Sequence, residues 1–548
     1  MNTTRNSSNS NNWSTASNES DFIESNENNN SNNWNTKVNI QQFLLRIPKA
    51  DLHIHLDGSI RIETLIDLAQ QYNVELPSYD AQELKDLVFP KKYNSLEEYL
   101  RGFGYITKVL TTPEALERVA YEVTMDAYHC GVRHIEVRFA PQMHAIPGNF
   151  SIEQVICAVN KGMERAARDA DELDELSQYV STTRSDEDDD ESMDISQQLD
   201  EETREKIQYL KNKQGMHPYH PDAPPHQYGI IACAMRFFLP VFSPYYEAFC
   251  EVHKGEDLHR VFGLASVALV TAVNNLRRKG KCCHDCESEE CPACSSSDPS
   301  DIISSDNDGF HGYILPVVAL DIAGAESGYP ASDHIEAFDL AHQSFLHKTV
   351  HAGEAYGPES IMEAVTDLHA ERIGHGCNLF KWEIIGEGEG RGGKSGRSSS
   401  SSSKNKNEMT DSQKQQYCEN LTRYLGSMRL CIEVCLSSNL QTIPELNGDL
   451  RKHPAKKMIK EGLAVALCTD NTLVSRTDIV REISLAVEAF QLTPSQLRDI
   501  VFNGFKRSFV AKRYSAKREY NRRVISYYKK IERESGLGGY GSEYEYGE

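Results

Sequence analysis

The segment from residue 48 to residue 59, PKADLHIHLDGS, alternates polar and aliphatic residues. The polar positions are Asp51, His53, His55 and Asp57, and the aliphatic positions between them are Leu52, Ile54 and Leu56. Because side chains on a β-strand alternate between its two faces, this pattern predicts a strand with one polar face. Two imidazoles on one face suit zinc and other borderline divalent ions. An ordinary half-buried strand with a hydrated face shows the same pattern. The rest of the chain is therefore needed to distinguish a metal-binding strand from an ordinary one.

Seven further short apolar segments are predicted as strands, mostly separated by segments with helical periodicity. The strands are expected at about 132–139, 229–236, 313–322, 348–351, 372–375, 430–436 and 464–469. Helices are expected at about 38–46, 60–73, 95–110, 113–129, 151–168, 258–276, 334–342, 360–368, 413–425 and 455–461. Thr493 and Gln496 form a capping box that opens one more helix. Alternating strands and helices favour an α/β fold, a (β/α)8 TIM-type barrel, over an open sheet.

The composition divides the 548-residue chain into one domain and several solvated segments. Residues 1–37 are dominated by Asn and Ser, which bury too little apolar surface to order themselves, so this end is expected to be disordered. We expect a barrel domain over 38–535, with low-complexity insertions at about 169–226, 277–309 and 386–412, and a flexible tail over 536–548. One helix is expected inside the first insertion, near 201–213.

Charge and apolar runs limit the location and the partners. The formal net charge of -23 argues against nucleic acid or an anionic membrane as the main partner. The amino-terminal segment has no apolar core of the secretory type, and the longest apolar run, 261–273, is too short to span a bilayer. Cysteines scattered through apolar segments are typical of reduced thiols. A cytoplasmic location is therefore expected, and protein partners stay unknown.

Chemistry-bearing residues gather at or just past the predicted strand ends, where TIM-type barrels place their active sites. They are His53 and His55 (first strand), Gly324 (fourth), His351 and Glu354 (fifth), His375 (sixth), and Asp470 with Asn471 (eighth). Three histidines and one aspartate suffice to hold one zinc ion, which keeps room for a water and acidifies it. One histidine and one glutamate then remain for proton transfer. Each residue alone has an ordinary structural explanation, but their joint placement predicts a metal site.

Five segments of the chain resemble the signature segments of the adenosine deaminase family, in the metal-dependent amidohydrolase superfamily. They are PKADLHIHLDGS, DIAGAE, TVHAGE, ERIGHG and LCTDN, and they occur in the order typical of that family. The resemblance spans about 48–509 and is interrupted by the three insertions. It implies zinc-dependent hydrolytic removal of the 6-amino group of adenosine, and of 2'-deoxyadenosine, giving inosine and ammonia in purine salvage.

The resemblance also implies a role for each site residue. The implied ligands of one Zn²⁺ are His53, His55, His351 and Asp470. The implied catalytic residues are Glu354, which protonates purine N1, His375, which orients or deprotonates the attacking water, and Asp470, which assists His375. The implied substrate contacts are His55 and Asp57 near the ribose, Gly324 as the backbone donor to N3, and Asn471. The fourth strand ends Asp321-Ile322-Ala323-Gly324 without a bridging lysine, which favours a single metal.

Two requirements follow from the implied chemistry. Glu354 has to carry a proton when substrate is bound, which requires burial or a hydrogen-bonding partner. Asn471 stands where many family members have a second aspartate. An amide donates to the acceptor N7 at any pH, whereas a carboxyl has to be protonated first, so we expect Asn471 to keep the contact.

Several alternatives stay open at this point. A sister deaminase acting on AMP, adenine or a modified adenosine would share the barrel and its metal, and an inactive nucleoside-binding barrel would share the fold. The Cys282–Cys294 cluster contains two Cys-x-x-Cys pairs and is either a second zinc site or a set of reduced thiols. The segment 386–412 follows His375 and could approach the mouth of the site.

Overall fold

The eight strands of the protein are parallel and follow one another in chain order around a barrel. The computed structural model describes residues 34, 39–93, 96–179, 201–212, 218–279, 317–386, 409–510 and 513–537. The strands are β1 (Lys49–His55), β2 (Val132–Phe139), β3 (Gln227–Met235), β4 (Val317–Ala323), β5 (His347–Ala352), β6 (Arg372–His375), β7 (Cys431–Val434) and β8 (Ala464–Leu467). This confirms the TIM-type (β/α)8 barrel, and the observed strands coincide with the expected segments to within a few residues at each end.

The barrel closes between its first and last strands through the residue that follows β8. The amide N–H of Asp470 donates to the carbonyl of His53, and the amide N–H of His55 donates to the carbonyl of Asp470, both at 2.7 Å. These bonds form an isolated parallel bridge between Ile54 and Asp470. The closure therefore brings residues of the first and eighth strands together at the carboxyl end of the barrel.

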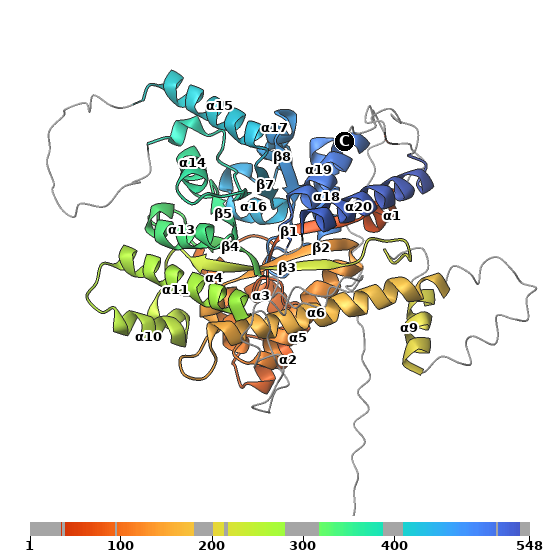
Figure 1. Ribbon diagram of the computed structural model, residues 1–548, viewed down its shortest axis with the longest axis horizontal. Helices are drawn as coiled ribbons and strands as arrows, with labels where there is room; N and C mark the ends of the chain where they lie inside the picture. Colours follow the sequence, from red (N-terminus) through yellow and green to blue (C-terminus); the bar gives the residue numbers. More distant parts are fainter. Residues whose placement is uncertain are drawn as a thin grey trace, which may run out of the picture.

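Helices surround the strands, as Figure 1 shows. They are α1 (Ile40–Arg46), α2 (Ile62–Gln71), α3 (Ala81–Val88), α4 (Leu96–Val109), α5 (Pro113–His129), α6 (Ile152–Leu176), α9 (Glu201–Asn212), α10 (Pro244–Val252), α11 (Leu258–Lys279), α13 (Ile335–Gln343), α14 (Pro358–Thr366), α15 (Asp411–Met428), α16 (Leu436–Thr442), α17 (Ala455–Lys460), α18 (Ile479–Phe490), α19 (Pro494–Arg507) and α20 (Tyr514–Glu534). Among the described residues, no helix is both long enough and apolar enough to cross a membrane.

Local sequence signals set several helix starts. The hydroxyl of Thr112 caps α5, whose first residue is Pro113. Thr493 and Gln496 form the expected capping box of α19, each side chain accepting a hydrogen bond from the other's backbone N–H. Such caps satisfy backbone donors that have no partner inside the helix.

The segment after residue 168 differs from its expected solvated state. Helix α6 was expected to end near Arg168 but continues to Leu176, because Ala170, Leu173 and Leu176 are buried against α5 and α9. Leu210 of α9 is fully buried in the same hydrophobic cluster. The described part of this segment is therefore packed onto the barrel's outer helices, and only the helix near 201–213 was anticipated.

Some predicted segments lie outside the described residues, and some helices of the structure were not predicted. The Cys282–Cys294 cluster and residues 387–408 of the third low-complexity segment fall outside the described ranges. Helices α3, α10, α16, α18 and α20 were not anticipated. Helix α20 is rich in charged residues, but its buried residues recur at helical spacing, and Tyr528 and Ile531 are fully buried against the core.

The close packing of α5 on α6 yields a stability prediction. A Cβ added at Gly162 would lie 2.1 Å from the carbonyl oxygen of Glu117, so Gly162→Ala has to push two helix backbones apart. We expect it to destabilise the fold by about 1–3 kcal/mol, measured by denaturant unfolding. Gly104→Ala in α4 is the matched control, because nothing lies within 4 Å of the added Cβ. Equal stabilities of the two variants would contradict this packing.

Candidate active site

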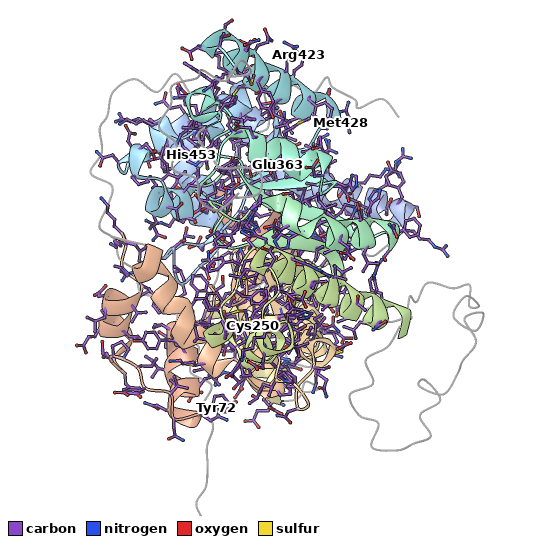
Figure 2. The ribbon with its side chains drawn as sticks, turned by 90° about the vertical axis from the view of Figure 1, so that its left-hand side faces the viewer. Tyr72, Cys250, Glu363, Arg423, Met428 and His453 are labelled. Atoms are coloured by element: carbon purple, nitrogen blue, oxygen red, sulfur yellow. The ribbon has the colours of Figure 1, made fainter. Side chains whose placement is uncertain are left out.

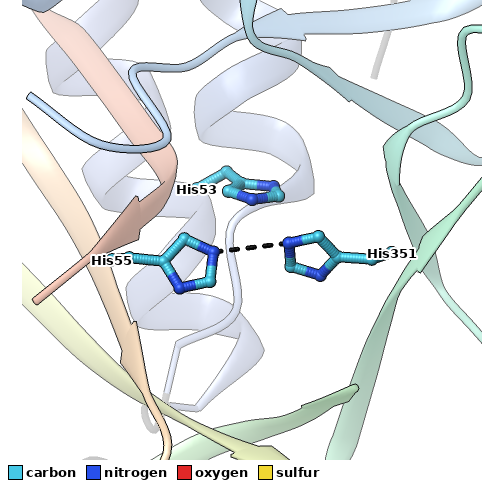
Figure 3. A group of neighbouring side chains, drawn as sticks. All are labelled: His53, His55 and His351. Carbon is cyan, nitrogen blue, oxygen red and sulfur yellow. Dashed lines mark hydrogen bonds between the residues drawn. The ribbon is translucent and has the colours of Figure 1, made fainter. Parts of the chain in front are cut away.

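Three histidine rings from β1 and β5 converge at the carboxyl end of the barrel. Figure 3 shows His53, His55 and His351 turned toward one another. The Nε2 atoms of His55 and His351 lie 3.3 Å apart. The Nε2 atom of His53 is buried and finds no hydrogen-bond partner among the described residues. Burial lowers the pKa of His55 well below its ordinary value, which keeps this ring in the neutral, metal-binding form.

Asp470 completes the cluster from the point where the barrel closes. Its Oδ1 atom lies 3.5 Å from Nε2 of His53 and 3.5 Å from Nε2 of His55. Its backbone is in the left-handed region, with φ of 62°, which is uncommon for a residue with a side chain. The two backbone bonds to β1 hold this conformation in place, so the carboxylate points at the histidines.

Three of the separations among these four groups, those of His55 from His351 and of Asp470 from His53 and His55, match the spacing around a tetrahedral metal. Bonds of about 2.0–2.1 Å in tetrahedral zinc sites put neighbouring ligand atoms about 3.3–3.4 Å apart. The observed separations of 3.3, 3.5 and 3.5 Å are close to that spacing. Histidine and carboxylate donors are also the usual ligands of catalytic zinc. The residues present therefore fit one zinc ion.

His375 and Glu354 lie beside this cluster. His375 ends β6 and is buried, and its ring nitrogens lie within 4.8 Å of the ligand atoms of His53 and Asp470. Its Nε2 atom lies 3.8 Å from Oε2 of Glu354. The hydroxyl of Thr442 in α16 donates to Oε1 of Glu354 at 3.3 Å. His375 has a left-handed φ of 65°, so two neighbouring site residues hold strained backbones.

Two buried carboxylates hold the rings of His53 and His351. The Nδ1 atom of His53 lies 2.8 Å from Glu433 in β7, and that of His351 lies 3.0 Å from Asp321 in β4. Arg138 in β2 donates to both carboxylates at 2.9 Å. A carboxylate on Nδ1 leaves the lone pair of Nε2 free for a metal. Glu433 and Asp321 therefore fix the tautomers of two candidate ligands.

The buried charged residues inside the barrel keep one another ionised. Burial raises the pKa of Glu433, but Arg138 and Arg372 outweigh burial and hold this pKa well below its ordinary value. Burial likewise raises the pKa of Asp321, and His351 and Arg138 reverse the shift. Both carboxylates are therefore ionised. Arg372 continues the network to Glu136 at 2.6 Å.

None of these buried charged residues was assigned a role from the sequence. Part of their signal was present, because Asp321 and Glu433 are single charges in otherwise apolar strands, whereas Glu136 and Arg138 lie in a strand with several charged residues. All four are fully buried. A charge in the middle of an apolar strand predicts a partner across the barrel, but the sequence does not say which one.

Glu326 is a further residue that sequence reasoning missed. Its carboxylate accepts the backbone N–H groups of Gly353, Glu354, Ala355 and Tyr356, and the hydroxyl of Ser360. These donors surround the start of α14 and the loop that carries Glu354. Glu326 therefore fixes this loop relative to β4.

The residues expected to contact substrate occupy the rim of the cluster. Asn471 is buried directly beneath Gly58, where an added Cβ would lie 1.6 Å from the Oδ1 atom of Asn471. Burial, together with the nearby charge of Asp470, raises the pKa of Asp57 to about 6. Gly324 is exposed at the end of β4 with a φ of 103°, and lies beside Arg236 rather than against the histidines.

The barrel and its histidine–aspartate cluster define a metal-dependent hydrolase of the amidohydrolase type. The model of the family described as adenosine deaminase matches residues 48–201 and 315–526. The chain therefore belongs to the adenosine deaminase family, and it is a hydrolytic deaminase. An adenosine deaminase from Clostridium kluyveri is 26% identical over 476 residues, which cover 87% of this chain and 93% of that protein.

Solved structures show the same fold at lower identity. An amidohydrolase from Burkhoderia ambifaria with bound zinc is 17% identical, with a TM-score of 0.57 over 91% of this chain and 94% of that one. The N6-methyl-AMP deaminase from Arabidopsis thaliana is 18% identical, with a TM-score of 0.52 over 89% of this chain and 98% of that one.

The carboxylate behind His53 yields a prediction on metal affinity. We expect Glu433→Gln to weaken zinc binding about 10–100-fold, because the ring of His53 loses its anionic partner. Competition of the apoprotein with a fluorescent zinc chelator measures this affinity directly.

The matched control is Glu122→Gln in α5, another buried glutamate, which accepts hydrogen bonds from Thr64 and Arg118 instead. Thermal unfolding of both apoproteins separates metal affinity from stability. Unchanged zinc affinity in a folded Glu433→Gln variant would refute the role of Glu433.

Proposed function

We propose that the protein catalyses zinc-dependent hydrolytic deamination of adenosine, and of 2'-deoxyadenosine, to inosine or deoxyinosine and ammonia. One observation carries the proposal. Metal-binding atoms of His53, His55, His351 and Asp470 converge, with three of their separations at 3.3 to 3.5 Å, and an acid and a histidine, Glu354 and His375, lie beside them. The sequence similarity to adenosine deaminases over most of the chain supports the choice of substrate.

The ligand set of the proposal is one zinc ion held by His53, His55, His351 and Asp470. A zinc ion in such a site supplies an activated water at neutral pH. Glu433 and Asp321 keep the Nδ1 protons of His53 and His351, so that both rings offer a lone pair to the metal. Asp470 is held ionised, since the neighbouring histidines outweigh the effect of burial and lower its pKa.

Proton transfer falls to Glu354 and His375 in this proposal. C6 of a purine is a poor electrophile, and protonation at N1 draws electron density out of the ring during attack. Glu354 is the acid for N1, because Glu326 fixes its loop and Thr442 bonds its carboxylate. His375, whose Nε2 atom lies 3.8 Å from Glu354, would orient the attacking water.

In this proposal, four residues around the metal cluster contact the purine nucleoside. Asn471 donates its amide to N7, the backbone of Gly324 donates to N3, and His55 and Asp57 face the ribose. Asn471 is held by direct packing on Gly58, which limits the positions its amide can take. Small-molecule substrate and water are the only partners the proposal requires.

A nucleotide substrate such as AMP or a modified AMP is the nearest alternative, because the Arabidopsis neighbour is an N6-methyl-AMP deaminase. A basic side chain is one way to bind its phosphate. Arg236 is buried near Gly324, and its guanidinium already donates to the carbonyls of Tyr329 and His351, at 2.8 and 2.7 Å. Arg236 is therefore not available as a phosphate ligand. Free adenine and an inactive binding barrel remain outcomes of the test below.

A cytoplasmic location and a role in purine salvage extend the proposal. Cys431, Cys435 and Cys468 are buried free thiols inside the barrel strands and their ends.

The proposal is tested by offering adenosine, deoxyadenosine, AMP, N6-methyl-AMP and adenine in parallel and separating the products by chromatography. We expect inosine from adenosine, with activity lost after chelation and restored by zinc. Glu354→Gln should lower kcat at least about 100-fold, because the proton donor to N1 is gone. Glu359→Gln, an exchange on the neighbouring helix α14, is the matched control. Turnover of AMP or adenine alone would move the substrate to a sister activity, and zinc binding without turnover would leave a binding protein.

The asparagine at position 471 yields a separate prediction on pH dependence. Asn471→Asp is isosteric and therefore fits beneath Gly58, but an ionised carboxylate cannot donate to N7. We expect KM for adenosine of this variant to rise with pH, by up to about tenfold per pH unit above the pKa of the new carboxyl. The wild-type KM should change far less over the same range. Parallel pH profiles of KM for the two proteins would contradict the N7 contact.

A further inference from the structure

A chain of hydrogen bonds runs behind His375, on the side away from the metal ligands. The Nδ1 atom of His375 lies 3.1 Å from the side-chain amide nitrogen of Asn439 in α16. The amide oxygen of Asn439 lies 3.1 Å from Nε2 of His453. The Nδ1 atom of His453 accepts the backbone N–H of Ala455, also at 3.1 Å. His453 precedes α17, in the carboxyl-terminal half of the molecule (Figure 2).

The far end of this chain fixes the direction of every bond in it. A backbone N–H can only donate, so Nδ1 of His453 has to be an acceptor without a proton. Burial lowers the pKa of His453 to about 3, so the ring is neutral and carries its single proton on Nε2. That proton points at Asn439, and the amide atom facing it has to be the oxygen. The nitrogen of the same amide is therefore turned to His375 and donates to it.

The thiol of Cys377 is compatible with this orientation of the amide. Its Sγ atom lies 3.2 Å from the same oxygen of Asn439. The thiol also lies 3.8 Å from the carbonyl oxygen of His375, so the Nε2 proton of His453 is the one that requires the amide oxygen. Were the amide turned over, its NH2 group would face the Nε2 proton of His453 and the Nδ1 atom of His375 would face an oxygen. All of these residues are buried, so water does not relieve such a clash.

We propose that Asn439 and His453 are positioning residues that hold neutral His375 with its proton on Nε2, directed into the active site. The inference deepens the proposed function and rests on it for the catalytic meaning of His375. An Nε2 that carries a proton has no lone pair for a metal. His375 is therefore a hydrogen-bond donor beside the metal site, and the cluster of His53, His375 and Asp470 is not the ligand set.

The same helix positions the second proton-transfer group. Thr442 follows Asn439 by three positions, so both side chains project from one face of α16. Asn439 contacts His375, and Thr442 contacts Glu354. Helix α16 thus aligns the donor and the acid, whose side chains lie 3.8 Å apart.

The test is nitrogen NMR of protein labelled with ¹⁵N-histidine, recorded on the zinc-free, substrate-free full chain. The resonances of His375 are assigned by their loss in His375→Gln. We expect an Nδ1 shift typical of an unprotonated acceptor nitrogen and an Nε2 shift typical of a protonated one. The opposite pattern, with the proton on Nδ1, would overturn the proposal. This readout does not depend on the substrate, so a wrong substrate and a wrong tautomer are distinguishable.

Two pairs of variants link the tautomer to activity. Asn439→Asp offers only acceptors, so the proton of His375 should move to Nδ1, and kcat should fall about 10–100-fold with a smaller change in KM. His453→Leu removes the donor to Asn439 and should lower kcat, whereas His453→Gln keeps an N–H donor and should recover most of it. A wild-type tautomer in folded Asn439→Asp, or equal kcat for the two His453 variants, would contradict the proposal.

The control for the loss of a buried neutral imidazole is His226→Gln. His226 is buried and bonds the carbonyl of Val132 at the amino end of β2, away from His375. Burial lowers its pKa to about 3, as for His453. This variant should leave both the tautomer of His375 and kcat unchanged. If it changed them as much as His453→Leu does, the effect would be one of general stability, and the proposal would fail.

Discussion

The site depends on one guanidinium in the middle of the barrel. Arg138 bonds Glu433 and Asp321, and these two carboxylates hold the rings of His53 and His351. Removing one partner of a buried ionic group leaves an uncompensated charge and typically costs about 3–5 kcal/mol. The interior of this barrel is thus filled by paired charges where many barrels use branched aliphatic side chains. Because these charges come from several strands, the positions of the histidine rings depend on the whole barrel rather than on one loop.

The backbone hydrogen bonds that close the barrel also position Asp470 in the candidate metal site. Asp470 pairs its backbone with His53 and His55, on either side of Ile54, and its left-handed conformation turns the carboxylate toward the two rings. His375 has the same uncommon conformation at the end of β6. Strained backbones persist only where surrounding contacts determine them fully, and they gather at functional sites. Here the strain belongs to a candidate ligand and to His375, the residue proposed to orient water.

The sequence predicted the barrel, because period-two and helical patterns report burial directly, and it predicted the clustered histidines, because parallel strands meet at one edge. It did not predict the residues that hold the histidine rings and the loop of Glu354. Glu433, Arg138 and Glu326 interact with residues that are distant in the sequence, and a single sequence does not reveal which residues pair across a barrel. The end of α6 was misplaced for the same reason, since Leu173 and Leu176 are covered by α9, which follows a long polar segment. Asn439 and His453 act through hydrogen-bond direction, which composition does not encode.

In the site we propose, one metal is held by three histidines and one aspartate, with His375 outside the ligand set. Anomalous X-ray diffraction at the zinc absorption edge, on crystals of the zinc-loaded full chain, locates the metal and its ligands together. We expect one anomalous peak in the barrel, within bonding distance of Nε2 of His53, His55 and His351 and of the Asp470 carboxylate. A peak bonded to His375, or two peaks sharing the site, would contradict it.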